Sequence, residues 1–190
     1  MESLILDGDD RRTLLDIARE AIRSRLAPGT RHPAPGTEGA LSRRCPAFVT
    51  LRRGDQLRGC IGHVEADRPL VDVIARAAVA AAFEDPRFPP VTAAELDEIS
   101  IEISVLGPMQ QVPDLSTIEV GRHGLVVQSG AKRGLLLPQV PTEWGWDRDT
   151  FLDQLCLKAG LPRGAWRTGA EILCFEADVF GDSDLPRRIR

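Results

Sequence analysis

The spacing of apolar positions predicts three amphipathic helices. Between residues 11 and 26, apolar side chains recur at intervals of three and four, and Asp9 or Asp10 is placed to cap the first free amides. An alanine-rich helix is expected to open at Asp67, and a third to follow a cap at Asp147. Because each segment has one apolar face, we expect all three helices to cover a sheet.

Strands are predicted where polar and apolar residues alternate or where β-branched and aromatic residues gather. Residues 47–53 and 56–64 are joined by Gly54-Asp55, which suits a tight turn because glycine tolerates positive φ. Residues 99–106 show the clearest alternation, with isoleucine or valine at every second position. A last strand over 172–180 is expected to bury its odd-numbered residues.

Shorter strand candidates lie at 118–120, 125–129 and 134–137, separated by glycine-containing turns, and suggest an antiparallel meander. Helices and strands do not alternate strictly, and hairpins are common. The pattern therefore predicts an α+β fold with an antiparallel or mixed sheet covered by helices. A solvated loop is expected over 30–39 and a frayed basic tail over 186–190.

Composition narrows the class of protein. The chain has 190 residues, 43% of them hydrophobic and 27% charged, which is typical of one large globular domain or two small packed ones. The net charge of −4 disfavours a general nucleic-acid binder, which would show a basic face. No apolar run approaches the roughly 20 residues of a membrane span, and the acidic N-terminus lacks a signal-peptide core, so we expect a cytoplasmic location.

Cofactor motifs are missing from the sequence. The four cysteines are not spaced as in C-x-x-C, and no histidine stands at a zinc-finger offset from any of them. Neither a dinucleotide-binding nor a P-loop glycine pattern opens a helix. We therefore predict no metal and no cofactor, and expect the cysteines to be free thiols.

One stretch, Leu57–His63, combines a guanidinium, a thiol and an imidazole with two glycines. On a regular strand, Arg58, Cys60 and Gly62 share one face, and the first two are about 6.5–7 Å apart. Positive charge beside a cysteine favours the thiolate, which is the nucleophilic form. Cys60 with Arg58 is therefore a candidate for thiol chemistry.

Other residues would complete such a site. His123 follows a glycine turn and precedes a strand, so it is placed to accept a proton from Cys60, because a Cys–His pair is the minimal unit of thiol catalysis. Glu102, on the polar face of its strand, would orient that histidine.

A binding pocket is the second part of this hypothesis. Gly59 and Gly62 lack a Cβ, which allows a small-molecule ligand to approach the backbone closely. Arg87, in the proline-rich segment after the alanine-rich helix, is expected to fix one rim of the pocket together with Asp85.

Purely structural interpretations remain open. Cys60 is small enough to fit beneath the alanine-rich helix, and Arg58 can pair with Glu102 or Asp85 as a buried ion pair. Trp144 and Trp146 are lids on the core or anchors for a partner protein. The sequence thus leaves two functions, a thiol-centred enzyme or enzyme component and a non-catalytic adaptor that docks protein partners.

The motifs resemble those of the AMMECR1 family, including its members called AmmeMemoRadiSam system protein A. Matching segments run in order over nearly the whole chain: Leu57-Arg58-Gly59-Cys60-Ile61-Gly62, Ala81-Ala82-Phe83-Glu84-Asp85-Pro86-Arg87-Phe88-Pro89-Pro90, Ile103-Ser104-Val105-Leu106, His123-Gly124-Leu125, Gly134-Leu135-Leu136-Leu137-Pro138-Gln139-Val140, Trp144-Gly145-Trp146-Asp147 and Lys158-Ala159-Gly160-Leu161. His123 lies within a matching pair, whereas His63 stands outside the signature.

The resemblance implies a single domain over residues 1–190 made of two intimately packed α+β parts, the smaller not separable from the sequence. It implies a Memo-like protein and a radical S-adenosylmethionine protein as partners. It assigns no reaction and no oligomeric state.

Overall fold

The computed structural model describes residues 6–27, 38–65 and 67–184. It divides into two compact units, which we describe separately. The large unit contains the residues up to Leu106 and those from Asp178 onward, and the small unit is Gly107–Ala177. The loop expected over 30–39 lies outside the described residues up to position 37, and the basic tail lies outside them entirely.

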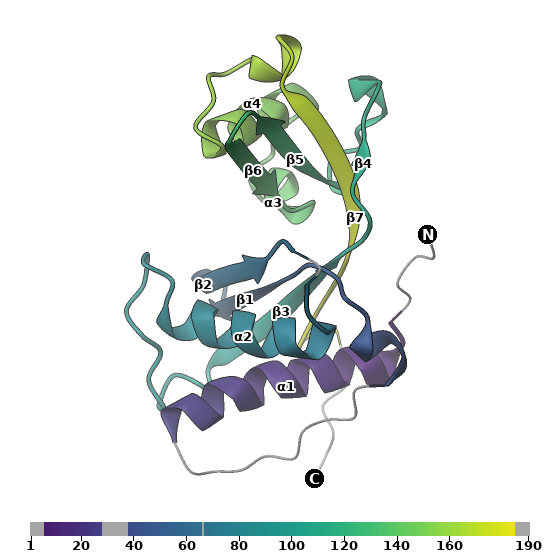
Figure 1. Ribbon diagram of the computed structural model, residues 1–190. Coiled ribbons are helices and arrows are strands. Elements are labelled where there is room, and N and C mark those ends of the chain that lie inside the picture. The colour runs from purple at the N-terminus through teal and green to yellow at the C-terminus, as the bar shows by residue number, and fades with distance from the viewer. Residues whose placement is uncertain (1–5, 28–37, 66, 185–190) are drawn as a thin grey trace. The chain divides into compact units, whose positions relative to one another are not determined.

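The large unit is built on an antiparallel sheet (Figure 1). β1 (Ala47–Arg53) pairs with β2 (Gln56–His63) on one side and with β3 (Ile99–Leu106) on the other. The next strand is the end of β7 (Glu171–Gly181), which leaves β2 at the edge. The predicted strand bounds agree with these within one residue.

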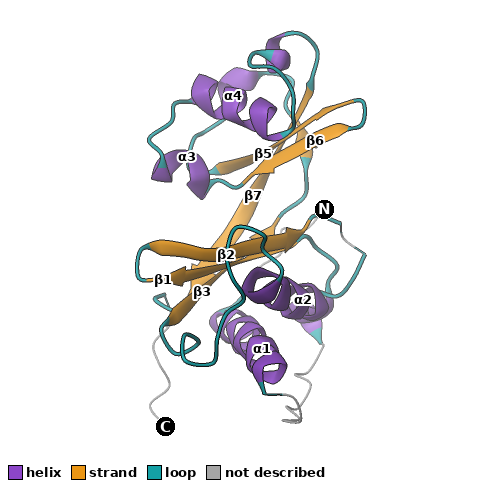
Figure 2. Ribbon diagram, turned by 90° about the vertical axis from the view of Figure 1, so that its left-hand side faces the viewer, coloured by secondary structure: helices purple, strands orange, loops and turns teal. Residues whose placement is uncertain are grey.

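Two helices cover one face of this sheet (Figure 2). α1 (Gly8–Leu26) packs on α2 (Leu70–Phe83), which packs on β1 and β2. The side chains pointing from sheet and helices into the core include Leu14, Ile22, Val49, Leu51, Ile74, Ala78, Ile101 and Ile103.

The predicted cap of the first helix, Asp9 or Asp10, was wrong. Asp7 caps α1 by accepting the amides of Asp9 and Asp10, and the Asp10 carboxylate reaches back to the Asp7 amide. The helix therefore starts three residues before the predicted segment, because a capping box at Asp7 satisfies its first free amides.

The small unit has its own core, and its strands pair with one another and with β7. β5 pairs with both β6 and β7, and β4 pairs with β7, all antiparallel. Phe151 and Leu152 are fully buried against this sheet. The elements of the unit are β4 (Gln110–Gln111), β5 (His123–Ser129), β6 (Lys132–Leu136), α3 (Gln139–Glu143) and α4 (Arg148–Lys158). Short 3₁₀ turns occupy Gly39–Ser42 in the large unit, and Leu115–Thr117 and Ala165–Arg167 in the small unit.

Two predictions about strands were wrong: the strand expected over 118–120, and the buried face expected for the last strand, β7. Residues 118–120 form no strand, because the backbone turns there: the His123 amide donates to the Glu119 carbonyl oxygen. In β7 the buried face changes along the strand, so that Val179 is exposed and Phe180 is buried. Ile172 belongs to the core of the small unit and Phe180 to that of the large unit, and both are even-numbered, so the predicted odd-numbered face is not the buried one at either position.

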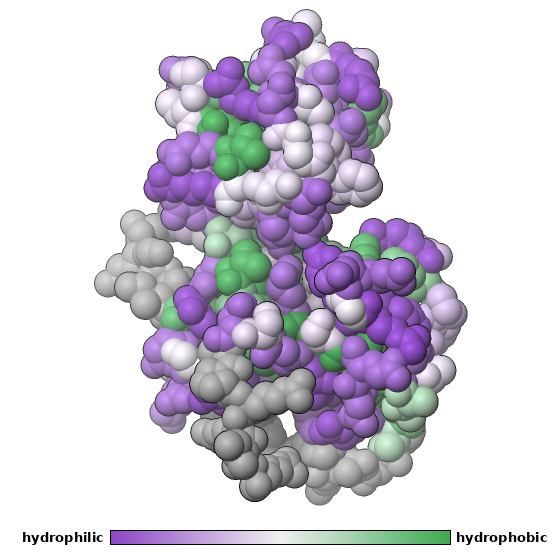
Figure 3. Space-filling model, turned by 180° about the vertical axis from the view of Figure 1, so that it is seen from behind, coloured by the Kyte–Doolittle hydropathy of each residue, from purple (hydrophilic) through white to green (hydrophobic). Residues whose placement is uncertain are grey.

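The architecture is the α+β class expected from the sequence, with antiparallel strands and covering helices. Figure 3 shows a mostly hydrophilic surface on the face seen from behind, with hydrophobic residues in small separate areas. Within the described ranges, none of the helices is both long enough and apolar enough to cross a bilayer.

Candidate functional site around Cys60

The Cys60 sulfur lies against a hydroxyl on the neighbouring strand. Cys60 in β2 is directly opposite Thr50 in β1, and the Thr50 hydroxyl donates to Sγ at 3.3 Å. Cys60 is half-buried, whereas Thr50 is only 5% exposed. In an antiparallel sheet, side chains approach most closely at pairs that exchange no backbone hydrogen bonds. Thr50 and Cys60 form such a pair, because the Cys60 peptide groups bond to residues outside β1.

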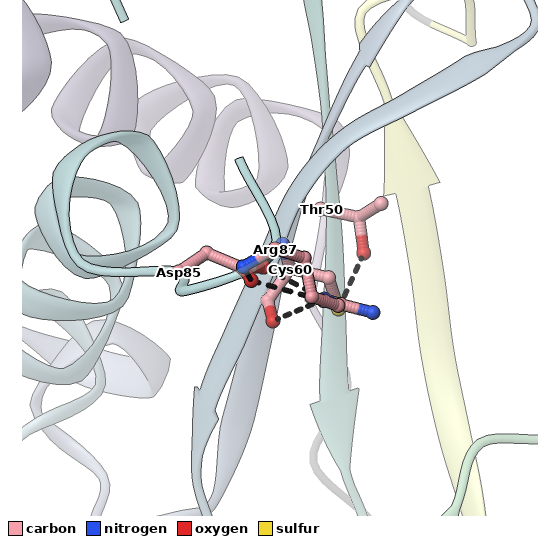
Figure 4. A network of polar contacts seen from close by, with 4 residues as sticks. All are labelled: Thr50, Cys60, Asp85 and Arg87. Atoms are coloured by element: carbon pink, nitrogen blue, oxygen red, sulfur yellow. Dashed lines mark hydrogen bonds and ion pairs between the residues drawn. The ribbon is translucent and has the colours of Figure 1, made fainter. Parts of the chain in front are cut away.

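Those peptide groups are held by Asp85 and Arg87 (Figure 4). Asp85 Oδ2 accepts the Cys60 amide at 2.9 Å, and Arg87 Nη2 donates to the Cys60 carbonyl oxygen at 3.3 Å. Since β2 is the edge strand, these two contacts replace the missing ladder partner. The segment after α2 thus fixes the backbone at the cysteine.

Asp85 and Arg87 also form a bidentate ion pair. Arg87 Nε donates to Oδ1 at 2.9 Å and Nη2 to Oδ2 at 2.7 Å, while the Arg87 amide donates to Oδ1 at 3.1 Å. The guanidinium and the two backbone amides hold the pKa of Asp85 well below its usual range, against the opposing effect of its burial. Asp85 is therefore an anion at neutral pH.

Arg58 does not follow the alternation expected of a regular strand. The register shifts by one between Leu51 and Arg52, so that Leu51 is opposite Gly59 and Arg52 is opposite Leu57. Arg58 is the extra residue of this β-bulge, and its side chain pairs with Glu95 through Nε at 3.1 Å and Nη2 at 3.3 Å.

The partner of Arg58 is thus Glu95 rather than Glu102 or Asp85. Arg58, together with the Thr92 amide and hydroxyl, lowers the pKa of Glu95 to about 2. The positive charge predicted to act on the thiol is therefore committed to a structural pair, and the guanidinium fixed at Cys60 is that of Arg87.

The two glycines of the motif serve close packing. A Cβ on Gly59 would lie 2.1 Å from the Ala81 carbonyl oxygen, so Gly59 lets α2 approach β2. A Cβ on Gly62 would lie 2.2 Å from the ring of Phe48, which stands opposite on β1. Their predicted contact with a ligand stays a prediction.

Glu102 lies in a row with the cysteine. Thr50 is opposite Cys60 on one side and opposite Glu102 on the other, so the three residues cross β2, β1 and β3 in register. They occupy the face of the sheet opposite to Val49 and Leu51, which point into the helix-covered core.

His123 belongs to the small unit, at the start of β5. Its Nδ1 accepts the Glu119 amide at 3.0 Å, so the proton of the neutral ring is assigned to Nε2. The predicted pairing of His123 with Cys60 joins residues of two different units and stays a prediction.

The other cysteines lie in surroundings that disfavour a thiolate. Burial raises the pKa of Cys45 to about 11, and burial also raises the pKa values of Cys156 and Cys174. Cys174 is half-buried like Cys60, which makes it a control for accessibility.

A group of possible metal ligands that the sequence analysis did not recognise begins at His63, the last residue of β2. Ligand atoms of His63, Glu65 and Asp67 all lie within 4.8 Å of one another, and His63 Nε2 is 2.8 Å from Asp67 Oδ1. All three side chains are partly or fully exposed. The predicted absence of a metal stays a prediction, with this cluster as the place to test it.

Comparisons with known proteins agree with the fold and the motifs. The family model described as AMMECR1 matches residues 15–180. A protein of Methanothermobacter thermautotrophicus is 44% identical over 92% of this chain and 95% of its own length, and protein MK0488 of Methanopyrus kandleri is 44% identical over 93% and 90%. The crystal structure of uncharacterized protein PH0010 from Pyrococcus horikoshii superimposes with a TM-score of 0.85 at 40% identity, covering 92% of this chain and 93% of that one. The chain belongs to the AMMECR1 family.

Proposed function

We propose that the protein is an enzyme, or a component of one, whose reactive group is the Cys60 thiol in a small-molecule pocket around Leu57–Gly62. The observation that carries the proposal is the fixing of Cys60 from both sides. Its sulfur accepts a hydrogen bond from Thr50, and its peptide groups are bound by Asp85 and Arg87. A thiolate is stabilised by a hydroxyl donor and a nearby guanidinium.

The placement of Cys60 favours a reactive role over a purely packing role. A cysteine that only fills space is typically buried in the core, as Cys156 is, with 0% exposure. Cys60 is half-buried and lies on the sheet face opposite the helix-covered core. Gly59, not Cys60, occupies the position beneath Ala81 of α2.

The proposal is tested by mapping alkylation rates. Folded protein is treated with iodoacetamide near neutral pH, and the modified cysteines are quantified by mass spectrometry. We expect Cys60 to react faster than Cys174, which has comparable exposure, and much faster than Cys45 and Cys156. Cys60 labelling only upon unfolding would refute a reactive thiol.

Matched variants show whether the reactivity of Cys60 depends on its polar neighbours or only on the accessibility of its sulfur. Thr50→Val keeps the volume but removes the hydroxyl, and Arg87→Met removes the guanidinium, so both are expected to slow Cys60 labelling. Arg53→Met is the control, because Arg53 is exposed and pairs with Glu98 at the end of β1. Circular dichroism verifies that each variant is folded.

We further propose that the reaction involves partners, a Memo-like protein and a radical S-adenosylmethionine protein. Support for this comes from family membership, since the resemblance implies both proteins. Co-purification of the tagged chain with each candidate partner tests it, with the Cys60→Ser variant in parallel. Failure of either partner to bind the folded chain at micromolar concentration would remove that partner.

A non-catalytic adaptor is the second candidate, and it is favoured by Trp144. This side chain is 70% exposed and stacks on Trp146 with ring centroids 6.1 Å apart. An exposed, oriented tryptophan is a common anchor at protein interfaces. If the chain is an adaptor, Trp144→Ala weakens partner binding while Cys60→Ser leaves it unchanged.

A further inference from the structure

We propose that the site at Cys60 recognises a substrate carrying an anionic group, a carboxylate or a phosphate, through the guanidinium of Arg87. The inference rests on the proposed function, because it concerns the substrate of the same thiol. It assigns to Arg87 a binding role beyond the predicted one of fixing a rim.

The ion pair at this site presents its positive end to solvent. The Arg87 side chain is 54% exposed, whereas the Asp85 side chain is only 2% exposed. The Asp85 carboxylate is further satisfied by the amides of Cys60 and Arg87. A ligand therefore meets an exposed guanidinium whose counter-charge lies beneath it, and an oriented pair of this kind attracts anions on its outer side.

The guanidinium is held in place and still has donors to offer. Its Nε and Nη2 are bound to Asp85, and Nη2 also reaches the Cys60 carbonyl oxygen. Its Nη1 makes no hydrogen bond within residues 6–27, 38–65 and 67–184. Because the side chain is already ordered, an acceptor bound at Nη1 costs little additional side-chain entropy.

Arg87 is also close enough to the thiol to affect chemistry there. The hydrogen bonds to the Asp85 carboxylate raise the pKa of Arg87, so the guanidinium beside Cys60 stays charged. The carbonyl oxygen that Arg87 contacts belongs to the same residue as the reacting sulfur. An anion bound at Arg87 would thus place the rest of a small molecule beside Sγ.

The other charged side chains near Cys60 do not remove the preference of the site for an anionic ligand. Arg58 and Glu95 neutralise one another in a bidentate pair. Glu102 is two strands away from Cys60, whereas Arg87 contacts the Cys60 peptide unit directly. Phe88 supports the guanidinium, which lies 5.5 Å from the centroid of its ring.

Two reagents that differ only in charge test the inference. Iodoacetate and iodoacetamide react with the thiolate sulfur in the same way: a C–S bond forms at the methylene carbon and iodide leaves with the bonding electrons. The readout is the ratio of the iodoacetate rate to the iodoacetamide rate at Cys60, measured against the same ratio for glutathione. We expect the ratio at Cys60 to be about three- to tenfold higher, and to fall as ionic strength rises.

Variants assign the preference to Arg87. Arg87→Met is expected to return the ratio to that of glutathione, and Arg87→Lys to retain part of the preference, since lysine keeps the charge but not the fork. Arg53→Met leaves the ratio unchanged. Labelling of Cys45, which is buried in the large unit, reports any unfolding of a variant in the same samples, so a lost preference is not confused with lost structure.

The outcomes distinguish the two proposals. If Cys60 reacts slowly with both reagents, the proposed thiol function is wrong and this inference falls with it. If Cys60 reacts rapidly with iodoacetamide but its ratio equals that of glutathione, the thiol function stands and anion recognition is overturned. A preference that persists in Arg87→Met also overturns the role of Arg87.

Discussion

The Asp85 carboxylate binds the Cys60 amide at 2.9 Å, although 25 positions separate the two residues in the chain. Asp85 lies in the segment that follows α2, and Cys60 lies in the edge strand β2. The contact ties a loop to a strand at the one residue whose side chain is the candidate reactive group. A single carboxylate thereby orders both the backbone of Cys60 and the guanidinium of Arg87.

Removing this carboxylate is expected to destabilise the large unit. Asp85→Asn leaves the Arg87 charge without its partner and replaces one acceptor by a donor facing backbone amides, which costs about 2–4 kcal/mol. The free energy of unfolding in urea measures the loss. Asp55→Asn, an exposed change in the β1–β2 turn, is the control and is expected to change stability by less than about 0.5 kcal/mol.

The two motif glycines are expected to differ in how they can be rescued. Gly59→Ala meets the Ala81 carbonyl oxygen, and Gly62→Ala meets the Phe48 ring. Each is expected to cost about 3 kcal/mol, because the space is already occupied. Phe48→Ala should relieve much of the strain of Gly62→Ala in the double variant, whereas Ala81→Gly cannot relieve Gly59→Ala, whose clash is with backbone.

Urea unfolding of the single and double variants gives the two coupling energies. Gly8→Ala is a control, since nothing lies within 4 Å of the added methyl group. Equal rescue at both positions would contradict the assignment of Gly59 to helix packing.

Acid is expected to weaken the pair between Arg58 and Glu95. The pKa of Glu95 is lowered to about 2 from its usual value of 4.5, so its carboxylate stabilises the folded state fully above about pH 4.5. That contribution is lost as the pH falls from about 4.5 towards 2, because the unfolded state binds the proton first.

Glu95→Gln should therefore lower stability at pH 7 and flatten its decline between pH 4.5 and 2. Glu84→Gln, at an exposed position after α2, serves as the control. Thermal unfolding at a series of pH values measures both effects. An unchanged acid dependence in Glu95→Gln would show that other carboxylates, Asp85 first, account for it.

Much of the fold could be predicted because it follows local pattern. The alternation in β3 and the apolar stripe of α2 each predict a buried face, and the residues predicted to be buried are buried in the structure. The cap at Asp147 was also predicted from residue type, and its carboxylate accepts the Thr150 amide. The short α3 was missed, since five residues are too few to show a helical period.

Several residues of the site, Cys60, Asp85 and Arg87 among them, could be predicted from the sequence, but the contacts between the site residues could not. Without a bulge, the turn at Gly54-Asp55 would pair Cys60 with Val49, on the helix-covered face. The extra residue at Arg58 moves Cys60 opposite Thr50 instead. No residue type in the segment demands a bulge at that point, so Thr50 was not recognised. Glu95 was missed because its pairing with Arg58 depends on tertiary structure across 37 positions.

Trp144 and Trp146 are expected to separate surface from core in the small unit. Trp146 is half-buried and packs against the cluster that contains Phe151 and Leu152, so Trp146→Ala should cost about 2–4 kcal/mol. Trp144 is 70% exposed, so Trp144→Ala should change stability by less than about 1 kcal/mol, the part due to stacking. Urea unfolding followed by tryptophan fluorescence and circular dichroism measures both. A large loss in Trp144→Ala would mean that this side chain supports the core, and it would remove the observation that favours a docking role, because an exposed anchor contributes to binding and not to folding.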